Sequence, residues 1–199
     1  GPSRASIMTG LRPDTLDMHT LKHELREKNP EVVTLGQLFR NNGYYSARAG
    51  KIYHYGNPSM IGTDGNDDMA TWDERHNPIG IDRSQQEKIT RYGAGQENNS
   101  NLGVSMAWWD PVSRDDEHTD GMVASKIVEL IGQNKNKPFF LAAGFFNPHC
   151  PYVAPKKYFD LYPLDQINMP NLEAAKRDLE DVPAMAVRRD MKNWPFYFN

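Results

Sequence analysis

Two loops of this sequence carry ionisable side chains among glycine, proline and aromatic residues. Lys51 and His54 lie in the first loop, and His149 lies in the second. A third cation, Arg4, lies in the first turn of a predicted helix, where free amide groups and the helix dipole attract anions. An arginine fork, a lysine charge and two imidazoles together suit a tetrahedral oxyanion such as sulfate or phosphate.

Each of these side chains also has an ordinary structural role open to it. Arg4 could form a surface ion pair, Lys51 could be a solvated loop lysine, and the two histidines could be hydrogen-bonded within their loops. Cys150 is interpreted as a small buried side chain. Its alternative role as a nucleophile would require a base beside it in space, which sequence proximity to a histidine does not provide.

The remaining polar clusters are interpreted as solvated. An acidic group between residues 64 and 68 lacks the ligand spacing of an EF-hand, so we expect a solvated turn there, formed by Asp64, Asp67 and Asp68. Four further histidines lie in polar stretches and are also expected to be exposed, namely His19, His23, His76 and His118. No metal ligand is therefore assigned within the chain.

The first half of an α/β arrangement is indicated by the residues around these loops. Residues 3–10 predict a short helix that ends at Gly10. The pattern Thr34-Leu35-Gly36-Gln37 is a capping box, and it predicts a second helix that stops before Gly43. A strand over 44–49 follows, so the loop with Lys51 lies beyond a strand end.

The second half repeats this order of elements. A helix is predicted to begin at Thr119 or Asp120, and the apolar run 139–144 predicts a strand buried on both faces. The loop with His149 follows this strand, and function collects at such loops in open α/β sheets. Between the halves, 55–116 shows no period and predicts a long irregular surface insertion. Residues 155–199 predict a peripheral segment.

Composition excludes several classes of function. The 199 residues carry 23 Lys and Arg against 26 Asp and Glu, a net charge of −3. A near-neutral chain argues against a nucleic-acid partner bound through a broad basic field. No apolar run is long enough to span a membrane. The single cysteine excludes an internal disulfide framework and a cysteine-based zinc cluster.

Several segments resemble, in order, motifs of one enzyme family. Gly1-Pro2-Ser3-Arg4 is followed, four residues later, by Thr9-Gly10. This resembles the sulfatase signature Cys (or Ser)-x-Pro-Ser-Arg-x-x-x-x-Thr-Gly, with the Cys or Ser standing immediately before Gly1. Four later segments resemble the iduronate-2-sulfatase-like group of that family, namely residues 11–15, 50–54, 147–151 and 158–163.

The resemblance implies an α/β fold, the alkaline-phosphatase-like α/β/α sandwich with a mostly parallel sheet. We expect this fold to be incomplete here, because residues 1–199 would form part of one sulfatase catalytic domain. The resemblance also implies a formylglycine nucleophile just before Gly1 and a calcium ion whose ligands lie outside this chain. Alone, the chain is therefore expected to be inactive.

The resemblance implies a role for each cationic residue. Arg4 would hold the formylglycine hydrate, and Lys51 would bind a sulfate oxygen. His54 would contact the hydrate and help to break down the covalent sulfate hemiacetal. His149 would bind sulfate and protonate the leaving alcohol.

The expected reaction is hydrolysis of sulfate esters on a sulfated sugar of a glycosaminoglycan or an algal polysaccharide. Two alternatives stay open: a formylglycine-type phosphodiesterase or phosphonate hydrolase, and a catalytically inactive sulfatase-like carbohydrate-binding protein. Expected partners are the sulfated carbohydrate and the remaining segments of the same sulfatase. By resemblance, the protein would be secreted, periplasmic or lysosomal.

Overall fold

The computed structural model describes residues 1–92, 102–103, 106–171, 177, 180–183 and 186. Its main sheet has three parallel strands in the order β2-β1-β5, which are β2 (Glu74–His76), β1 (Tyr45–Gly50) and β5 (Phe139–Gly144). The register of β1 and β5 runs from Tyr45 opposite Phe139 to Gly50 opposite Gly144. The two loops predicted to carry the chemistry therefore leave the sheet side by side.

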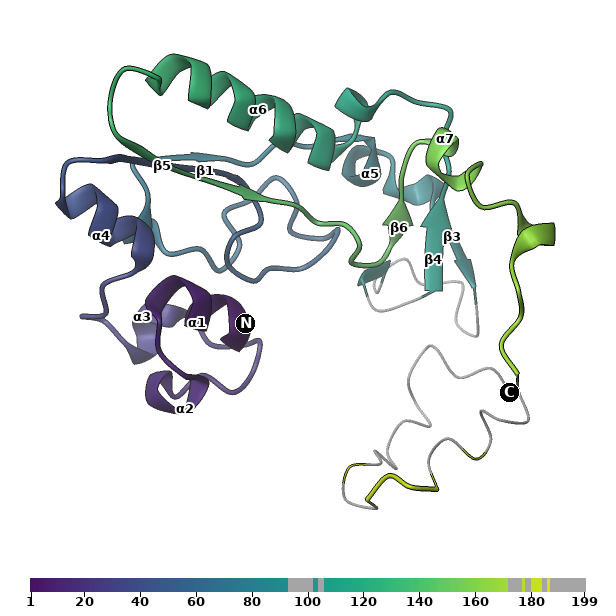
Figure 1. The fold of residues 1–199 in the computed structure, drawn as a ribbon, viewed down its shortest axis with the longest axis horizontal. Helices are drawn as coiled ribbons and strands as arrows, with labels where there is room; N and C mark the ends of the chain where they lie inside the picture. Colours follow the sequence, from purple (N-terminus) through teal and green to yellow (C-terminus); the bar gives the residue numbers. More distant parts are fainter. Residues whose placement is uncertain (93–101, 104–105, 172–176, 178–179, 184–185, 187–199) are drawn as a thin grey trace.

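Helices cover both faces of this sheet. Helix α6 (Thr119–Asn134) packs on one face, and α4 (Leu35–Asn41) packs on the other, with α1 (Pro2–Thr9) beside it (Figure 1). Val123 and Leu130 of α6 are buried against the strands, as their helical spacing predicts. The mixed α/β architecture with a parallel sheet confirms the predicted fold class.

The helix ends follow the predicted sequence signals. Gly10 ends α1 in the left-handed region, with φ of 72°. Thr34 caps α4, and both halves of its capping box with Gln37 are present. The prediction for α6 is one residue off, because His118 is its N-cap and Thr119 and Asp120 lie in its first turn.

The largest hydrophobic cluster lies between α1 and the strand-end loop of β1. Met8 packs there with Tyr53 and Trp72, and with residues of α2 (Pro13–Leu16) and α3 (Leu25–Lys28). This burial attaches the N-terminal helix to the loop that carries Lys51. It therefore sets where Arg4 lies relative to that loop.

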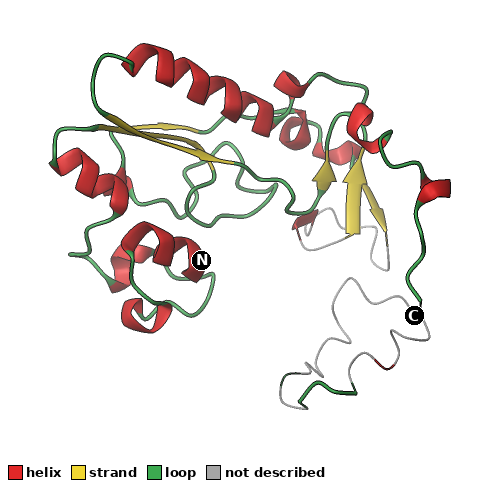
Figure 2. Ribbon diagram, viewed as in Figure 1, coloured by secondary structure: helices red, strands yellow, loops and turns green. Residues whose placement is uncertain are grey.

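A second, smaller sheet extends from the loop after β5. Strands β3 (Thr90–Tyr92) and β4 (Met106–Trp109) are antiparallel, and β6 (Tyr152–Val153) pairs with β4 in parallel (Figure 2). The short remaining elements are α5 (Ile81–Ser84), α7 (Lys156–Phe159), η1 (Met69–Thr71), η2 (Gln86–Lys88), η4 (Asp115–Glu117) and η5 (Leu164–Gln166).

The segment 55–116 is more ordered than the irregular surface insertion predicted for it. It supplies strand β2 to the main sheet, and its residues Tyr55, Ile61 and Trp72 are buried. Its strands are only three or four residues long, so no hydrophobic period could show in the sequence. Residues 93–101 and 104–105 of this segment lie outside the described residues, as does most of the predicted peripheral segment beyond residue 171.

The prediction of a solvated acidic turn is wrong. The Asp67 side chain is 1% exposed and lies 2.5 Å from Nε of Arg48, a wholly buried arginine of β1. The Asp68 side chain is 2% exposed and lies 2.9 Å from Arg26. These carboxylates are buried because each is paired with an arginine, a compensation that only the tertiary structure creates.

Two other burial predictions are also wrong. His118 is buried and lies 2.8 Å, through Nε2, from the Ser113 hydroxyl. Strand β5 is half-exposed over most of its length, because it is the edge of the three described strands.

Within the described part of the chain, no helix is long and apolar enough to cross a bilayer.

Candidate active site

The site forms where β1 and β5 end together. The backbone N–H of Lys51 donates to the carbonyl of Gly144 at 2.8 Å. Gly50 has φ of 76°, and a Cβ added to it would lie 2.1 Å from the Gly144 oxygen. A Cβ on Gly144 would lie 2.2 Å from the Lys51 carbonyl oxygen. Both glycines are therefore needed for the two loops to leave the sheet in contact.

Arg4 joins this site from helix α1. Its Nη1 donates to the carbonyl oxygens of Lys51 and Ile52, both at 2.8 Å. Burial lowers the pKa of Arg4, although the group stays charged at neutral pH. The guanidinium thus fixes the loop after β1 through two carbonyls and keeps its other N–H groups for another partner.

Lys51 is the most buried cation of the site, with 3% of its surface exposed. Burial, and then the charge of Arg4, lowers the pKa of Lys51 to about 8. Its Nζ lies 5.9 Å from the centre of the Phe146 ring. Among the described carboxylates, none lies within ion-pair distance of Arg4 or Lys51. Two adjacent, partly buried cations with no counter-charge among the described carboxylates create a positive potential that would attract an anion.

The His54 ring is affected by the charges of the three other predicted site residues. Burial, followed by the positive charges of the Gly1 amino group, Lys51, Arg4 and His149, lowers the pKa of His54 to about 4. The structure therefore brings all four residues into one electrostatic environment, despite their separation in the sequence. At neutral pH the His54 imidazole is uncharged, so one ring nitrogen can accept a proton.

We expect the imidazole carbon-bound proton resonances of His54 to stay constant from pH 9 down to about pH 5 and to shift near pH 4. The folded pKa is below the ordinary value of 6.5, so the unfolded chain binds more protons between pH 4 and 6.5. Stability should therefore fall as pH falls through that window. Nuclear magnetic resonance titration measures the first effect, and urea unfolding at several pH values measures the second.

The His54→Asn variant is the matched control for this prediction. It removes the titrating ring, so its stability should depend less steeply on pH between 4 and 6.5 than that of the unmodified protein. A His54 resonance that titrates near pH 6.5 would show that the surrounding cations do not act on this ring.

His149 lies on the exposed loop after β5. Its Nδ1 is 2.7 Å from the carbonyl oxygen of Cys150, and because a carbonyl only accepts, Nδ1 carries the hydrogen. Nε2 is then the nitrogen available to a substrate. The Cys150 side chain is half-buried, and its thiol donates to the Gly103 carbonyl at 2.8 Å. Burial raises the pKa of Cys150, which agrees with the predicted structural role.

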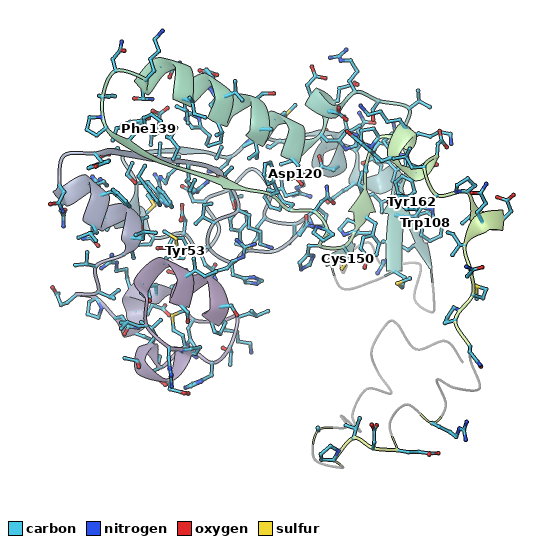
Figure 3. The ribbon with its side chains drawn as sticks, in the orientation of Figure 1. Tyr53, Trp108, Asp120, Phe139, Cys150 and Tyr162 are labelled. Carbon is cyan, nitrogen blue, oxygen red and sulfur yellow. The ribbon has the colours of Figure 1, made fainter. Side chains whose placement is uncertain are left out.

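Two residues that sequence reasoning missed hold the His149 loop. The Asp120 carboxylate, at the start of α6, accepts the backbone N–H groups of Phe146 at 2.7 Å and Asn147 at 2.9 Å. Figure 3 shows Asp120 beside the end of β5. On the other side, Nδ2 of Asn57 donates to the carbonyls of Cys150 at 3.1 Å and His149 at 3.3 Å. Asp120 was visible in the sequence as a helix cap, but its actual partners are distant in the sequence.

A cavity of about 460 Å³ adjoins the cations. Arg4 and Lys51 line it together with apolar residues of α1 and β5, among them Met8, Phe140 and Ala142. The two histidines are not part of its lining. The cavity is thus an apolar recess beside the anion site rather than the whole of the site.

The described residues near these cations do not fit a calcium ion. Calcium takes six to eight oxygen ligands, mostly carboxylates and carbonyls. The side chains here are a guanidinium, an ammonium and two imidazoles, and no group of three His, Cys, Asp or Glu among the described residues could hold a metal.

Comparison with known proteins places this arrangement in a family. The model of the sulfatase family matches residues 1–180. The chain is 29% identical to a sulfatase of Formosa agariphila over 94% of this chain and 37% of the relative. It is 31% identical to iduronate 2-sulfatase of Mus musculus, over 84% of this chain and 30% of the relative. The chain thus spans about a third of the length of these relatives.

Two further relatives were found. The chain is 27% identical to choline-sulfatase of Rhizobium meliloti over 90% of its own length and 35% of the relative. A solved sulfatase structure from work on glycosaminoglycan metabolism by Bacteroides thetaiotaomicron aligns at 18% identity and a TM-score of 0.44. That alignment covers 88% of this chain and 41% of the other. The family match alone spans most of the chain, and the chain therefore belongs to the sulfatase family.

Proposed function

We propose that this chain supplies the sulfate-binding and proton-transfer side chains of an enzyme that hydrolyses sulfate esters. The observation that carries the proposal is the pair of partly buried cations, Arg4 and Lys51, with no counter-charge among the described carboxylates. Such a pair gains most from an anion that enters the site. Family membership supports sulfate as that anion.

The nucleophile in this proposal is a formylglycine bonded to Gly1. When present, its hydrate supplies the oxygen that attacks sulfur. The charges of Arg4 and Lys51 both act at the nitrogen of Gly1, which is partly buried. A residue attached at that nitrogen would thus lie beside both cations, which supports this placement. A calcium ion held by ligands outside this chain remains part of the proposal.

Each side chain has a distinct task in this scheme. Lys51 holds a sulfate oxygen with a charge that apolar surroundings strengthen. Arg4 offers its free N–H groups to the nucleophile side of the site. His54, neutral at working pH, accepts a proton from the attacking group. His149, in its doubly protonated form, donates the proton on Nε2 to the leaving oxygen and is left as the neutral ring with its hydrogen on Nδ1.

The proposed substrate is a sulfated sugar of a glycosaminoglycan or an algal polysaccharide. One relative is an iduronate 2-sulfatase, which supports a sugar sulfate. The similarity to a choline-sulfatase means that family membership alone does not require a sugar. By the same resemblance, we propose a secreted, periplasmic or lysosomal location.

A Lys51→Met variant of the complete enzyme tests the proposal. Loss of a preorganised charge that stabilises the transition state should lower kcat on an aryl sulfate by about 10²–10³-fold. Lys126→Met is the matched control, because Lys126 pairs with Glu129 on the outer surface of α6 and should leave kcat unchanged. Initial rates of phenol release measure both.

The same assay separates the two other candidate functions. An enzyme that hydrolyses an aryl phosphodiester faster than the aryl sulfate would be a phosphodiesterase, since one cation pair suits either anion. A protein that binds sulfated sugar but hydrolyses neither ester would be an inactive carbohydrate-binding member of the family.

A further inference from the structure

A second cavity, remote from the cations, lies where β4 meets the segment after α7. Its volume is about 610 Å³, and its wall includes Trp108, Asp110, Lys156, Phe159, Asp160 and Tyr162. Figure 3 labels Trp108 and Tyr162, which both line this cavity. Nothing in the proposed reaction uses these residues.

Two aromatic side chains of this cavity are exposed to solvent. Trp108 is 37% exposed and Tyr162 is 72% exposed. Isolated exposed aromatic residues are common, but two that share one cavity form an apolar platform with polar edges. A sugar ring has the complementary shape, because its C–H groups form an apolar face and its hydroxyls form a polar rim.

The charges of the cavity select among sugars. Lys156 is paired with Asp160, and this hydrogen bond, followed by the charges of Asp160 and Asp110, raises the pKa of Lys156. Two carboxylates against one ammonium leave the cavity with a net negative charge. Carboxylate oxygens accept hydrogen bonds from sugar hydroxyls but repel a sulfate group. The cavity therefore suits an uncharged sugar ring.

The backbone connects this cavity to the proposed active site. Tyr152 of β6 is opposite Trp108 of β4 and lies three residues after His149. Extended-chain dimensions then place the Cα atoms of His149 and Trp108 within about 16 Å of each other. The Lys156 N–H donates to the Pro111 carbonyl at 2.8 Å, which fixes α7 against the same sheet. An oligosaccharide of a few rings can span this separation.

We propose that this cavity binds an unsulfated sugar ring of the substrate chain while a sulfated ring occupies the cationic site. This inference rests on the proposed function only for the identity of the polymer. The substrate would then be a polysaccharide that carries both sulfated and unsulfated rings, rather than a densely sulfated chain or a single sugar.

Saturation-transfer difference NMR on the intact protein tests the cavity without requiring turnover. The probes are neutral tetrasaccharides of galactan, xylan and mannan type, and a galactan tetrasaccharide sulfated on every ring. Tyr162→Ala is the test variant, because an exposed side chain can be removed with little effect on folding. Tyr158→Ala is the matched control, since Tyr158 is 46% exposed on neighbouring α7 and outside the cavity wall.

We expect at least one neutral tetrasaccharide to bind, with at least tenfold weaker affinity in Tyr162→Ala and unchanged affinity in Tyr158→Ala. The fully sulfated tetrasaccharide should not compete with it for this cavity. Absence of binding by every neutral probe, equal affinity in the two variants, or competition by the sulfated probe at Tyr162 would each overturn the inference. The aryl sulfate assay tests the proposed function separately, because a single-ring substrate does not reach this cavity.

Discussion

Replacement of His149 by alanine in the complete enzyme should lower turnover of an alkyl sulfate by about 10²–10⁴-fold. Cleavage of the S–O bond leaves an alkoxide, which is a poor leaving group unless it is protonated in the transition state. Nδ1 of His149 donates its hydrogen to the Cys150 carbonyl, so the doubly protonated ring has its second proton on Nε2, and this is the proton for the leaving oxygen. In the proposed function Lys51 keeps its charge to hold the sulfate, so the imidazole is the better proton donor.

The choice of substrate supplies the control for this prediction. An aryl sulfate with an acidic phenol releases a phenolate, which leaves without protonation. The fall in kcat caused by His149→Ala should therefore be much smaller on this substrate. Stopped assays of sulfate release compare kcat on the two substrates. An equal loss on both would remove the general-acid role and leave His149 with a role in binding alone.

Replacement of Arg48 by methionine should destabilise the protein by about 3–5 kcal/mol. Arg48 is wholly buried and contacts Asp67, and it also donates to the Gly50 carbonyl at 3.0 Å and to Asn77 at 2.7 Å. Removal of the guanidinium leaves the Asp67 carboxylate buried without a counter-charge. Since domains are stable by only about 5–15 kcal/mol, this loss is a large part of the total.

Urea unfolding of Arg48→Met and Arg114→Met measures the difference. Arg114 also pairs with an aspartate, Asp116, at 2.9 Å, but both side chains are more than half exposed. An exposed pair contributes at most about 1 kcal/mol. The double variant Arg48→Met with Asp67→Leu should lose less than the two single losses added together. Equal unfolding midpoints for the two arginine variants would contradict the prediction.

The cationic residues were predictable because each follows a clear local signal. Arg4 lies in a helix marked by Pro2 and Gly10, and Lys51 and His149 each lie in a loop that follows a predicted strand. Parallel strands align their carboxyl ends, so two such loops must meet. The roles of these side chains stay predictions, since charge and proximity alone do not identify a reaction.

The supporting residues were not predictable, because their partners are distant in the sequence. From the sequence alone Asp67 is predicted to be exposed, because its ion pair with Arg48 forms only in the folded chain. Asn57 lies 92 residues from its partner His149. The buried pair of Arg48 and Asp67 did have a signal in the sequence. An arginine within the run Ser46-Ala47-Arg48-Ala49-Gly50 must either break the strand or find a buried counter-charge.

The anchoring of the His149 loop by Asp120 makes the position of this loop sensitive to acid. Both oxygens of that carboxylate accept an N–H from the loop, and burial raises the pKa of Asp120. Protonation turns one acceptor into a donor that faces an N–H, so the loop loses one of its two attachments to α6. On the acid side of a pH–rate profile for the proposed reaction, the fall in rate would then have two causes: the loss of this attachment and the titration of the reacting groups.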